Sequence, residues 1–232
     1  MGESIPVKLD RAADESELLS RARGLAGESV ATLAIRLGVA LEGEAVRTKG
    51  KVGTLIERAL GADGGCAATW DFSALRVELK TIPVDSRGQP RESTFVCAAS
   101  LIDAERAEWA TSWARAKLSR VLWVPIVGDS KGGERRVGDA ILWSPSAAQE
   151  RQFADDFDDI FGRIGFGDIE AMSGHVGRFL QLRPKGAHGR VRTLSPGAEG
   201  TLVAAMPRGL YLRARFTGAI LRDPMAFPDD AR

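Results

Sequence analysis

Apolar residues recur at helical spacing near the start of the chain. After the polar run at 14–17, Leu18, Ala22 and Leu25 repeat every three or four positions, which predicts an amphipathic helix. The acidic and serine side chains in front of this pattern favour a capped helix start, and Gly27 is expected to end the helix.

A second, shorter helix is expected at 30–37, and a third at 52–60 with an apolar stripe along one side. In the third helix Glu57 lies away from the stripe, with Gly53 and Gly61 one turn before and after it on the same face. Glycine inside a helix lowers its stability by about 1 kcal/mol relative to alanine, so glycine at position 53 calls for a structural explanation. Either another element or a phosphate approaches this face closely, or Gly53 lies in the first turn and Gly61 caps the end.

A two-residue alternation follows. Val77 and Leu79 are apolar, whereas Glu78 and Lys80 are charged, and this is the period of a β-strand. Glu78 and Lys80 are therefore expected to project from one face of a strand. Asp71 stands upstream, separated from Glu78 by six positions.

The rest of the chain mixes strands with helices. We expect strands at 94–98 and 121–127, and the second is apolar on both faces, which is typical of a central strand. Further predicted elements are a basic helix at 109–120, a helix at 147–162, and short strands or loops at 179–184 and 209–215. This order predicts a mixed α/β or α+β fold. The chain has no Gly-x-Gly-x-x-Gly or P-loop pattern, so we do not expect a nucleotide-binding fold.

Composition narrows the class of protein. The 232 residues suffice for one large domain or two small lobes without disulfide bonds. Two cysteines are too few for a disulfide framework or a zinc site, and the two histidines lack metal-ligand spacing, so we take both types as non-catalytic. No signal peptide or membrane-length apolar run appears, and we expect a cytoplasmic protein without a membrane partner.

The net charge of +1 does not favour a strongly basic nucleic-acid-binding domain. Any contact with DNA must therefore come from local basic clusters, and its affinity should depend on salt concentration.

Asp71, Glu78 and Lys80 carry the most informative candidate chemistry. Two carboxylates suit Mg²⁺, a hard cation that takes oxygen ligands, and a lysine beside them can orient a water and offset negative charge. These are the parts of a metal-dependent phosphodiesterase site. The pattern alone is weak, because Glu-x-Lys on a strand is commonly a solvated face or a cross-strand ion pair.

Several separate blocks, in order, strengthen the candidate site. They are Lys49-Gly50 with Leu55-Ile56-Glu57, Asp71-Phe72 through Val84, Thr94-Phe95-Val96-Cys97, Lys117 through Pro125, Arg135-Arg136-Val137-Gly138, Leu142-Trp143-Ser144-Pro145, Leu180 through Lys185, and Pro207 through Leu212. Together they resemble the MutH family of DNA mismatch-repair endonucleases, which are relatives of type II restriction enzymes. The resemblance runs from about residue 16 to about residue 221.

The resemblance implies a restriction-endonuclease-like α/β core with two lobes flanking a DNA-binding cleft. On this basis we expect a flexible tail at 1–13, the endonuclease domain at 14–222, and a second flexible tail at 223–232. The implied activity is Mg²⁺-dependent nicking of the unmethylated strand at hemimethylated GATC sites, 5′ to the G.

The resemblance also assigns roles to residues of the catalytic site. Asp71 and Glu78 correspond to metal-binding carboxylates, Lys80 to the catalytic lysine, and Glu57 to an acidic residue that completes the site. The backbone carbonyl of Leu79 is implied as a further metal ligand, for one or two Mg²⁺ ions.

A second group of residues is implied in contacts with double-stranded DNA. Lys49 and Lys117 match basic residues beside the cleft. Arg183, Pro184 and Lys185 match a loop that contacts bases, and arginine suits bidentate hydrogen bonding to guanine. Tyr211, the only tyrosine, matches the residue that senses adenine N6-methylation. Phe95 belongs either to the core or to the DNA-contacting residues.

The implied partners are the ATPase MutL, which activates nicking, and indirectly the mismatch sensor MutS. We expect a monomer. Lys51, the turn at 128–133 and the segment at 186–205 depart from the family pattern. Two alternatives stay open: a restriction-type enzyme that cuts both strands through a paired active site, and a non-catalytic DNA-binding protein of the same fold.

Overall fold

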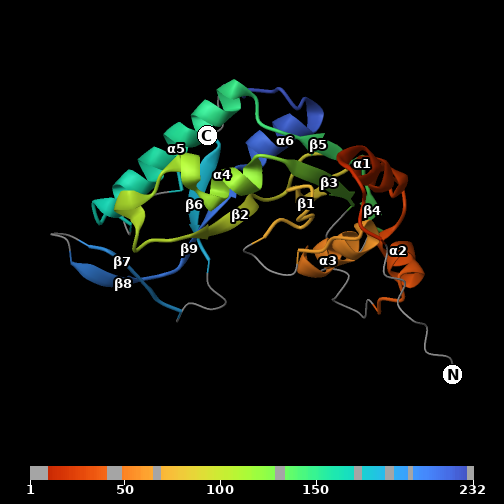
Figure 1. Ribbon diagram of the computed structural model, residues 1–232, viewed down its shortest axis with the longest axis horizontal. Helices are drawn as coiled ribbons and strands as arrows, with labels where there is room; N and C mark the ends of the chain where they lie inside the picture. The colour runs from red at the N-terminus through yellow and green to blue at the C-terminus, as the bar shows by residue number, and fades with distance from the viewer. Residues whose placement is uncertain are drawn as a thin grey trace. The chain divides into compact units, whose positions relative to one another are not determined.

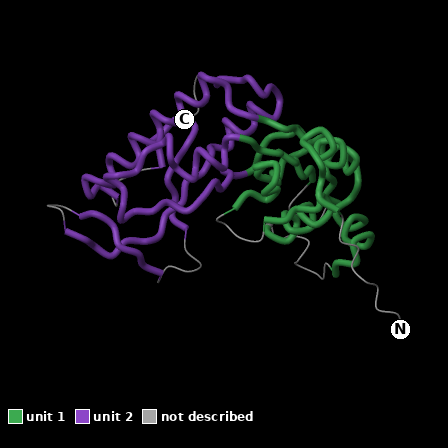
Figure 2. Tube along the Cα trace, viewed as in Figure 1, with its two compact units in different colours: residues 1–91, 120–143 green, residues 92–119, 144–232 purple. Residues whose placement is uncertain are grey.

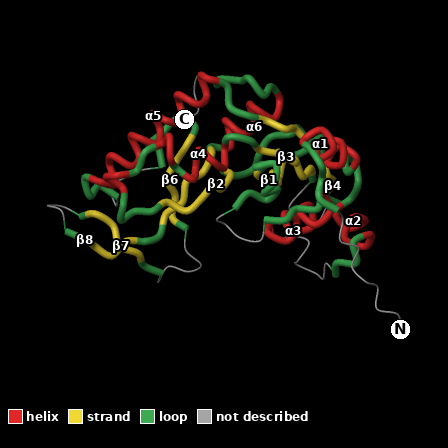
Figure 3. Tube along the Cα trace, viewed as in Figure 1, coloured by secondary structure: helices red, strands yellow, loops and turns green. Residues whose placement is uncertain are grey.

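A computed structural model describes residues 10–40, 49–64, 69–128, 134–169, 174–185, 191–197 and 201–228 (Figure 1). The chain forms two units, coloured in Figure 2. Unit 1 comprises Met1–Arg91 and Arg120–Trp143, and unit 2 comprises Glu92–Ser119 and Ser144–Arg232. Helices and strands occur in both units (Figure 3), so the mixed α/β class is confirmed.

The sheet of unit 1 is built around β3 (Val121–Val127). On one edge, β1 (Glu78–Val84) runs parallel to it in continuous register. On the other edge, β4 (Arg136–Val137) and β5 (Ile141–Trp143) pair with it antiparallel. β3 has strands on both edges and is buried along most of its length, so the prediction of a central strand is confirmed.

Among the described residues of unit 1, three helices accompany this sheet: α1 (Glu15–Gly24), α2 (Val30–Arg36) and α3 (Lys49–Leu60). Asp14 caps α1 and Ser29 caps α2 through side-chain hydrogen bonds to backbone N–H groups, as these residue types favour. The first two helices confirm the predictions. The helices and the sheet share one apolar core, which includes Leu18, Leu33, Leu55, Ile56, Val77 and Leu122.

The predicted start of α3 was wrong. The helix begins at Lys49 rather than at Val52, so Gly53 lies in the second turn and not in the first. Gly61 follows the last helical residue with a φ of 73°, a left-handed conformation that glycine adopts without strain. The structure therefore supports the capping interpretation for Gly61 but not the first-turn interpretation for Gly53.

The main sheet of unit 2 has β9 (Arg208–Leu212) in the centre, between β2 (Thr94–Ala99) and β6 (Leu180–Pro184). All pairings are antiparallel. Leucines of β6 and β9 are buried on one face of this sheet, at positions 180, 182, 210 and 212. α5 (Ala147–Gly165) packs beside β6, as Figure 1 shows. Its capping box at Ser146 sets the start of the helix.

Aromatic rings form much of the core of unit 2. Phe153 of α5 makes edge contacts with Phe179 and Phe216, with centroids 5.9 and 5.3 Å apart. The buried carboxylate of Asp156 accepts N–H groups of residues 178–180 at 2.6 to 2.8 Å, which fixes the start of β6 on the helix. Burial of one such aromatic side chain stabilises a fold by about 1.5–3 kcal/mol.

Two sequence predictions in unit 2 need correction, and one hairpin had no prediction. The helix predicted at 109–120 is interrupted: a 3₁₀ turn at Trp109–Thr111 precedes α4 (Trp113–Leu118), because Ser112 caps a new helix. α6 (Ala214–Arg222) was not predicted; it begins within the range 209–215, where a short strand or loop was expected. A small hairpin of β7 (Thr193–Pro196) and β8 (Leu202–Ala205) lies in the segment that matched the family poorly.

The expected tails are packed where the structure describes them. Ala12 is buried, and the backbone N–H of Ala13 donates to Glu17. At the other end, the Gln149 amide donates to the carbonyls of Pro224 and Ala226. Residues 1–9 and 229–232 lie outside the described residues. No helix within the described ranges is both long and apolar enough to cross a lipid bilayer.

Candidate active site and DNA-contact face

A tight hairpin brings Asp71 to β1. The N–H of Phe72 donates to the Val77 carbonyl at 3.0 Å, and the N–H of Val77 donates back to the Phe72 carbonyl at 3.2 Å. Arg76 closes the turn with a φ of 54°. The Asp71 carboxylate then accepts the N–H of Leu79 at 2.7 Å. The six residues between Asp71 and Glu78 therefore form the hairpin that returns the chain beside Asp71.

Glu78 and Lys80 lie on one face of β1, as the alternation predicts. The Lys80 Nζ donates to Glu78 Oε1 at 2.5 Å, and the Glu78 side chain is only 3% exposed. Val77 and Leu79 are buried. A carboxylate buried this far from water is costly unless it is paired, and Lys80 provides that partner.

Glu57 approaches the same residues from α3. Burial raises the pKa of the Glu57 carboxyl, the nearby Asp71 raises it further, Lys80 opposes the rise, and Glu78 adds to it. The four predicted catalytic side chains thus act on one another electrostatically within unit 1. The carboxylates of Asp71 and Glu78 already accept hydrogen bonds, from the Leu79 N–H and from Lys80.

The close-approach explanation for Gly53 is only partly right. A Cβ atom at this position would lie 3.6 Å from Thr81 Oγ1 and 3.9 Å from Glu57 Oε1. These are ordinary van der Waals distances, so α3 does approach β1 here but the space also admits alanine. The structure gives no steric reason for glycine at position 53.

The chemistry of this donor set fits a hard divalent cation. It offers carboxylate oxygens, and the pKa of Glu57 is raised first by burial and then by the nearby Asp71 and Glu78 carboxylates, whose repulsion a bound cation would relieve. Among the described residues, however, no three acidic, histidine or cysteine side chains are close enough together to form a finished metal cage. The carboxylates are neighbours that hydrogen-bond to protein groups, not a preformed coordination shell.

Three of the predicted DNA-contacting residues, Arg183, Pro184 and Tyr211, lie on strands of the main sheet of unit 2. Tyr211 stands in the central strand β9, opposite Phe95 on one side and Gln181 on the other. Directly opposed residues in an antiparallel sheet project from the same face. The rings of Phe95 and Tyr211 meet edge to face, with centroids 5.3 Å apart. Phe95 is therefore part of this aromatic pair and only half-buried, rather than a core residue.

Gly209 makes room for the pair. A Cβ atom at this position would lie 2.9 Å from Phe95 Cε2 and 3.2 Å from Tyr211 Cε2. The first distance is shorter than side-chain packing allows, so any larger residue would push the rings apart. Sequence reasoning did not identify this glycine, because the contact joins strands that are distant along the chain.

Cations flank the two rings. The guanidinium carbon of Arg183 lies 5.8 Å from the Tyr211 ring centroid, and Lys185 Nζ lies 2.9 Å from the Phe95 ring centroid. Arg183 also donates to Ser93 Oγ at 3.1 Å. Burial raises the pKa of the Tyr211 phenol, Arg183 opposes the rise, and Glu92 adds to it, so the hydroxyl stays protonated at neutral pH. The exposed Arg183 guanidinium beside the Tyr211 phenol can donate hydrogen bonds to acceptor atoms of a ligand.

The remaining predicted contact residues differ from one another. Arg183, Pro184 and Lys185 are exposed at the end of β6. Lys117, by contrast, is 5% exposed and its Nζ lies 5.2 Å from the Trp113 ring centroid, so it is not the surface lysine expected beside a cleft. The side chain of Lys49 lies outside the described residues, although its backbone starts α3.

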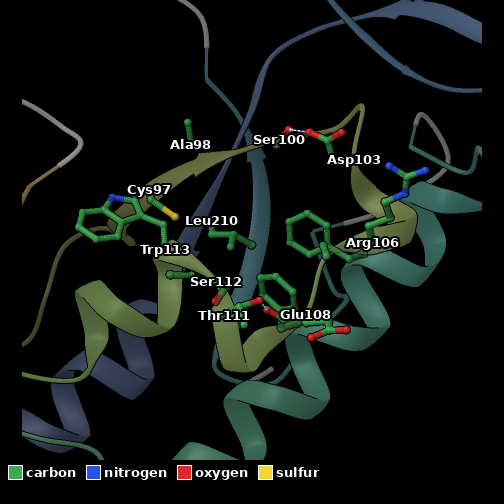
Figure 4. Close-up of a pocket in the computed structure, with 14 residues that line it drawn as sticks. Cys97, Ala98, Ser100, Asp103, Arg106, Glu108, Thr111, Ser112, Trp113 and Leu210 are labelled. Carbon is green, nitrogen blue, oxygen red and sulfur yellow. Dashed lines mark hydrogen bonds between the residues drawn. The ribbon is translucent and has the colours of Figure 1, made fainter.

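Unit 2 also contains a cavity of about 270 Å³, shown in Figure 4. Cys97, Trp113 and Leu210 line it on one side, and Arg106 and Glu108 line it on another. None of the predicted catalytic or DNA-contacting residues lines this cavity. Its walls are mostly apolar, and the candidate chemistry lies elsewhere.

A mixed α/β protein with three carboxylates and a lysine around one strand has the parts of a phosphodiesterase site, and comparison with known proteins identifies the family. A family model described as DNA mismatch repair enzyme MutH matches residues 60–156. Proteins named DNA mismatch repair protein MutH from Salmonella typhi, Salmonella paratyphi B and Salmonella newport are each 46% identical over 211 residues, which is 90% of this chain and 91% of each relative. The chain belongs to the MutH family of DNA mismatch repair endonucleases. Membership implies a restriction-endonuclease-like fold and a metal-dependent nuclease.

Proposed function

We propose that this protein nicks the unmethylated strand at hemimethylated GATC sites, 5′ to the G, with Mg²⁺ as cofactor, and that MutL activates it after mismatch detection by MutS. The observation that carries the proposal is the convergence of Glu57, Asp71, Glu78 and Lys80 in unit 1. The finer part of the fold prediction, two lobes flanking a DNA-binding cleft, is part of the same proposal.

Glu57, Asp71 and Glu78, with the Leu79 carbonyl, would hold one or two Mg²⁺ ions. A bound Mg²⁺ supplies a water of lowered pKa and neutralises charge on the scissile phosphate. The protein contributes fixed positions: the Leu79 N–H holds one Asp71 oxygen, and β1 holds Glu78 beside Lys80.

Lys80 has two tasks in the proposed reaction. Its ammonium group orients the attacking water, and its positive charge offsets the charge that develops on the phosphate. The water loses a proton to solvent as its oxygen bonds to phosphorus, the bond from phosphorus to the 3′ oxygen breaks, and the leaving oxygen takes a proton from solvent. The products are a 5′-phosphate and a 3′-hydroxyl.

We assign recognition of the GATC sequence and of adenine methylation to one face of the main sheet of unit 2. This surface, called the aromatic face, carries Phe95, Arg183 and Tyr211. Arg183 is exposed and able to donate two parallel hydrogen bonds to guanine. The protonated Tyr211 hydroxyl would lie at the adenine N6 group, where a methyl group removes a hydrogen and adds bulk. Pro184 and Lys185 extend the same surface at the end of β6, and Lys49 is assigned to a contact with the DNA backbone, whereas the buried Lys117 is given no DNA contact.

The test uses supercoiled plasmids with a single GATC site, prepared unmethylated, hemimethylated and fully methylated, with and without MutL. We expect Mg²⁺-dependent nicks in the first two substrates, confined to the unmethylated strand and increased by MutL. Linear product from a dimer would instead indicate a restriction-type enzyme. Binding without cleavage in the presence of MutL would indicate a non-catalytic protein.

A further inference from the structure

The residues that follow α3 fold back onto the segment that carries Asp71. The N–H of Ala62 donates to the Glu57 carbonyl at 2.9 Å, as the last turn of the helix closes. The N–H groups of Asp63 and Gly64 then donate to the Asp71 carbonyl at 2.9 and 3.0 Å. These hydrogen bonds tie the main chain of Asp71 to the C-terminal end of α3, the helix that carries Glu57.

The Asp63 side chain adds a second tie. Its two oxygens accept the backbone N–H and the hydroxyl of Ser73, both at 2.8 Å. Ser73 belongs to the hairpin that returns the chain beside Asp71. Arg11 also pairs with Asp63 at 3.1 Å, but the Arg11 side chain is 71% exposed and the Asp63 side chain is 11% exposed. Exposed ion pairs contribute little, so the two bonds to Ser73 matter more.

Gly64 shows how closely these segments approach each other. A Cβ atom at Gly64 would lie 2.1 Å from the Trp70 carbonyl oxygen and 2.8 Å from the Asp71 Cα. No L side chain fits without moving the backbone of Asp71. The contact between 63–64 and 70–71 is therefore a close backbone junction, not an incidental approach.

We infer that Asp63 is a positioning residue, which holds the Ser73 hairpin and through it the Asp71 carboxylate at the fixed end of α3. The inference rests on the function proposed above, because it matters only if Asp71 serves the reaction. Hydrogen-bond partners that orient metal ligands typically change metal affinity or activity about 10- to 100-fold when they are removed.

The test compares Asp63→Ala with Asp63→Asn. Alanine removes both hydrogen bonds, whereas asparagine keeps an acceptor for the Ser73 N–H and places an amide by its hydroxyl. We expect Asp63→Ala to weaken Mg²⁺ binding about 10-fold in titration calorimetry and to lower kcat about 10-fold, with an unchanged KM for DNA. Asp63→Asn should recover most of both values.

Asp85→Ala is the matched control. Asp85 accepts the N–H groups of Arg87 and Gln89 at 2.8 and 2.9 Å in another turn of unit 1. Asp85→Ala removes two side-chain hydrogen bonds of the same kind, and neither of them holds the segment that carries Asp71. Mg²⁺ affinity and kcat should therefore stay within about twofold of wild type. Melting temperatures of all variants separate a general loss of stability from a loss of positioning.

Amide hydrogen exchange gives a readout that needs no nuclease activity. The Leu79 N–H, which donates to Asp71, should exchange faster in Asp63→Ala and at the wild-type rate in Asp85→Ala. Wild-type Mg²⁺ affinity and Leu79 exchange in a folded Asp63→Ala would overturn the inference, as would an Asp63→Asn variant no better than alanine. If alanine prevents folding, Ser73→Ala, which removes the hydroxyl bond to Asp63, decides the question: weaker Mg²⁺ binding and faster Leu79 exchange are expected, and wild-type values of both would overturn the inference. A wild-type protein that fails to nick would overturn the proposed function instead, and the exchange result would still test the tie.

Discussion

The acidic site of unit 1 and the aromatic face of unit 2 are built in opposite ways. Glu57, Asp71, Glu78 and Lys80 come from one short stretch of chain and are held by backbone hydrogen bonds and burial. The aromatic face draws Phe95, Arg183 and Tyr211 from three strands that are distant in sequence, and its cations are exposed.

The difference matches what each region would have to do. A site that stabilises charge on a phosphate gains from rigid, partly buried groups, because their dipoles and charges need no reorganisation. A surface that reads bases must expose its donors to the groove of a large ligand. The comparison therefore predicts that changes in unit 1 mainly alter turnover, whereas changes in unit 2 mainly alter binding and site choice.

The largest expected effect is that of Lys80→Ala. Loss of the ammonium group should lower the nicking rate by at least about 100-fold, because the group orients the water and offsets developing charge. Single-turnover nicking of a hemimethylated plasmid and a DNA-binding titration measure the two effects separately. Affinity should change little. Nicking by Lys80→Ala at the wild-type rate would show that Lys80 is not catalytic and would contradict the proposed active site.

Arg183→Ala should give the complementary result. We expect the preference for GATC over sites altered at the G to fall about 10- to 100-fold, since one bidentate contact discriminates by about 1–3 kcal/mol. Competition between plasmids with correct and altered sites measures this ratio. The Mg²⁺ concentration for half-maximal rate should stay unchanged. A changed Mg²⁺ dependence with intact site preference would reverse the assignment of the two units.

Two glycines test the packing of the regions directly. Gly209→Ala should lower the free energy of unfolding by about 1–3 kcal/mol, because the new methyl group would overlap Phe95. Gly53→Ala meets only ordinary contacts and should raise that free energy by about 1 kcal/mol through helix propensity. Urea unfolding of both variants gives the comparison. Equal destabilisation by both changes would contradict the described difference in space.

The smallest effect concerns the pH dependence of stability. The pKa of Glu57 is raised in the folded protein, so folding favours its protonated form, and stability falls as pH rises from the ordinary glutamate pKa through the raised value. Glu57→Gln removes this group and should flatten that part of the curve, making the metal-free variant more stable than wild type above the window. Thermal melts from pH 4 to 8 without Mg²⁺ measure it. A wild-type protein that gains stability relative to the variant across this range would contradict the sign.

Much of unit 1 was readable from sequence because its signals are local. The cap at Asp14, the alternation around Glu78 and the apolar run of β3 each act within a few residues, and each gave the observed element. The helix at 109–120 was misread because Ser112 restarts the helix through a cap, which competes with helical periodicity. α6 was missed because 209–215 was interpreted as a short strand or loop, and no element was predicted for the residues that follow.

The sequence by itself determined the kind of chemistry: a carboxylate and a lysine at strand spacing, a second carboxylate upstream of the strand, and a third on a nearby helix. Tertiary structure alone decided the surroundings that tune them. It buried Glu78 and Lys117, turned Asp63 onto Ser73, and set Gly209 beneath the pair of Phe95 and Tyr211. The physical reason is range: hydrogen-bond spacing and periodicity follow from neighbours in the chain, whereas burial and cross-strand contact depend on residues that only folding brings together.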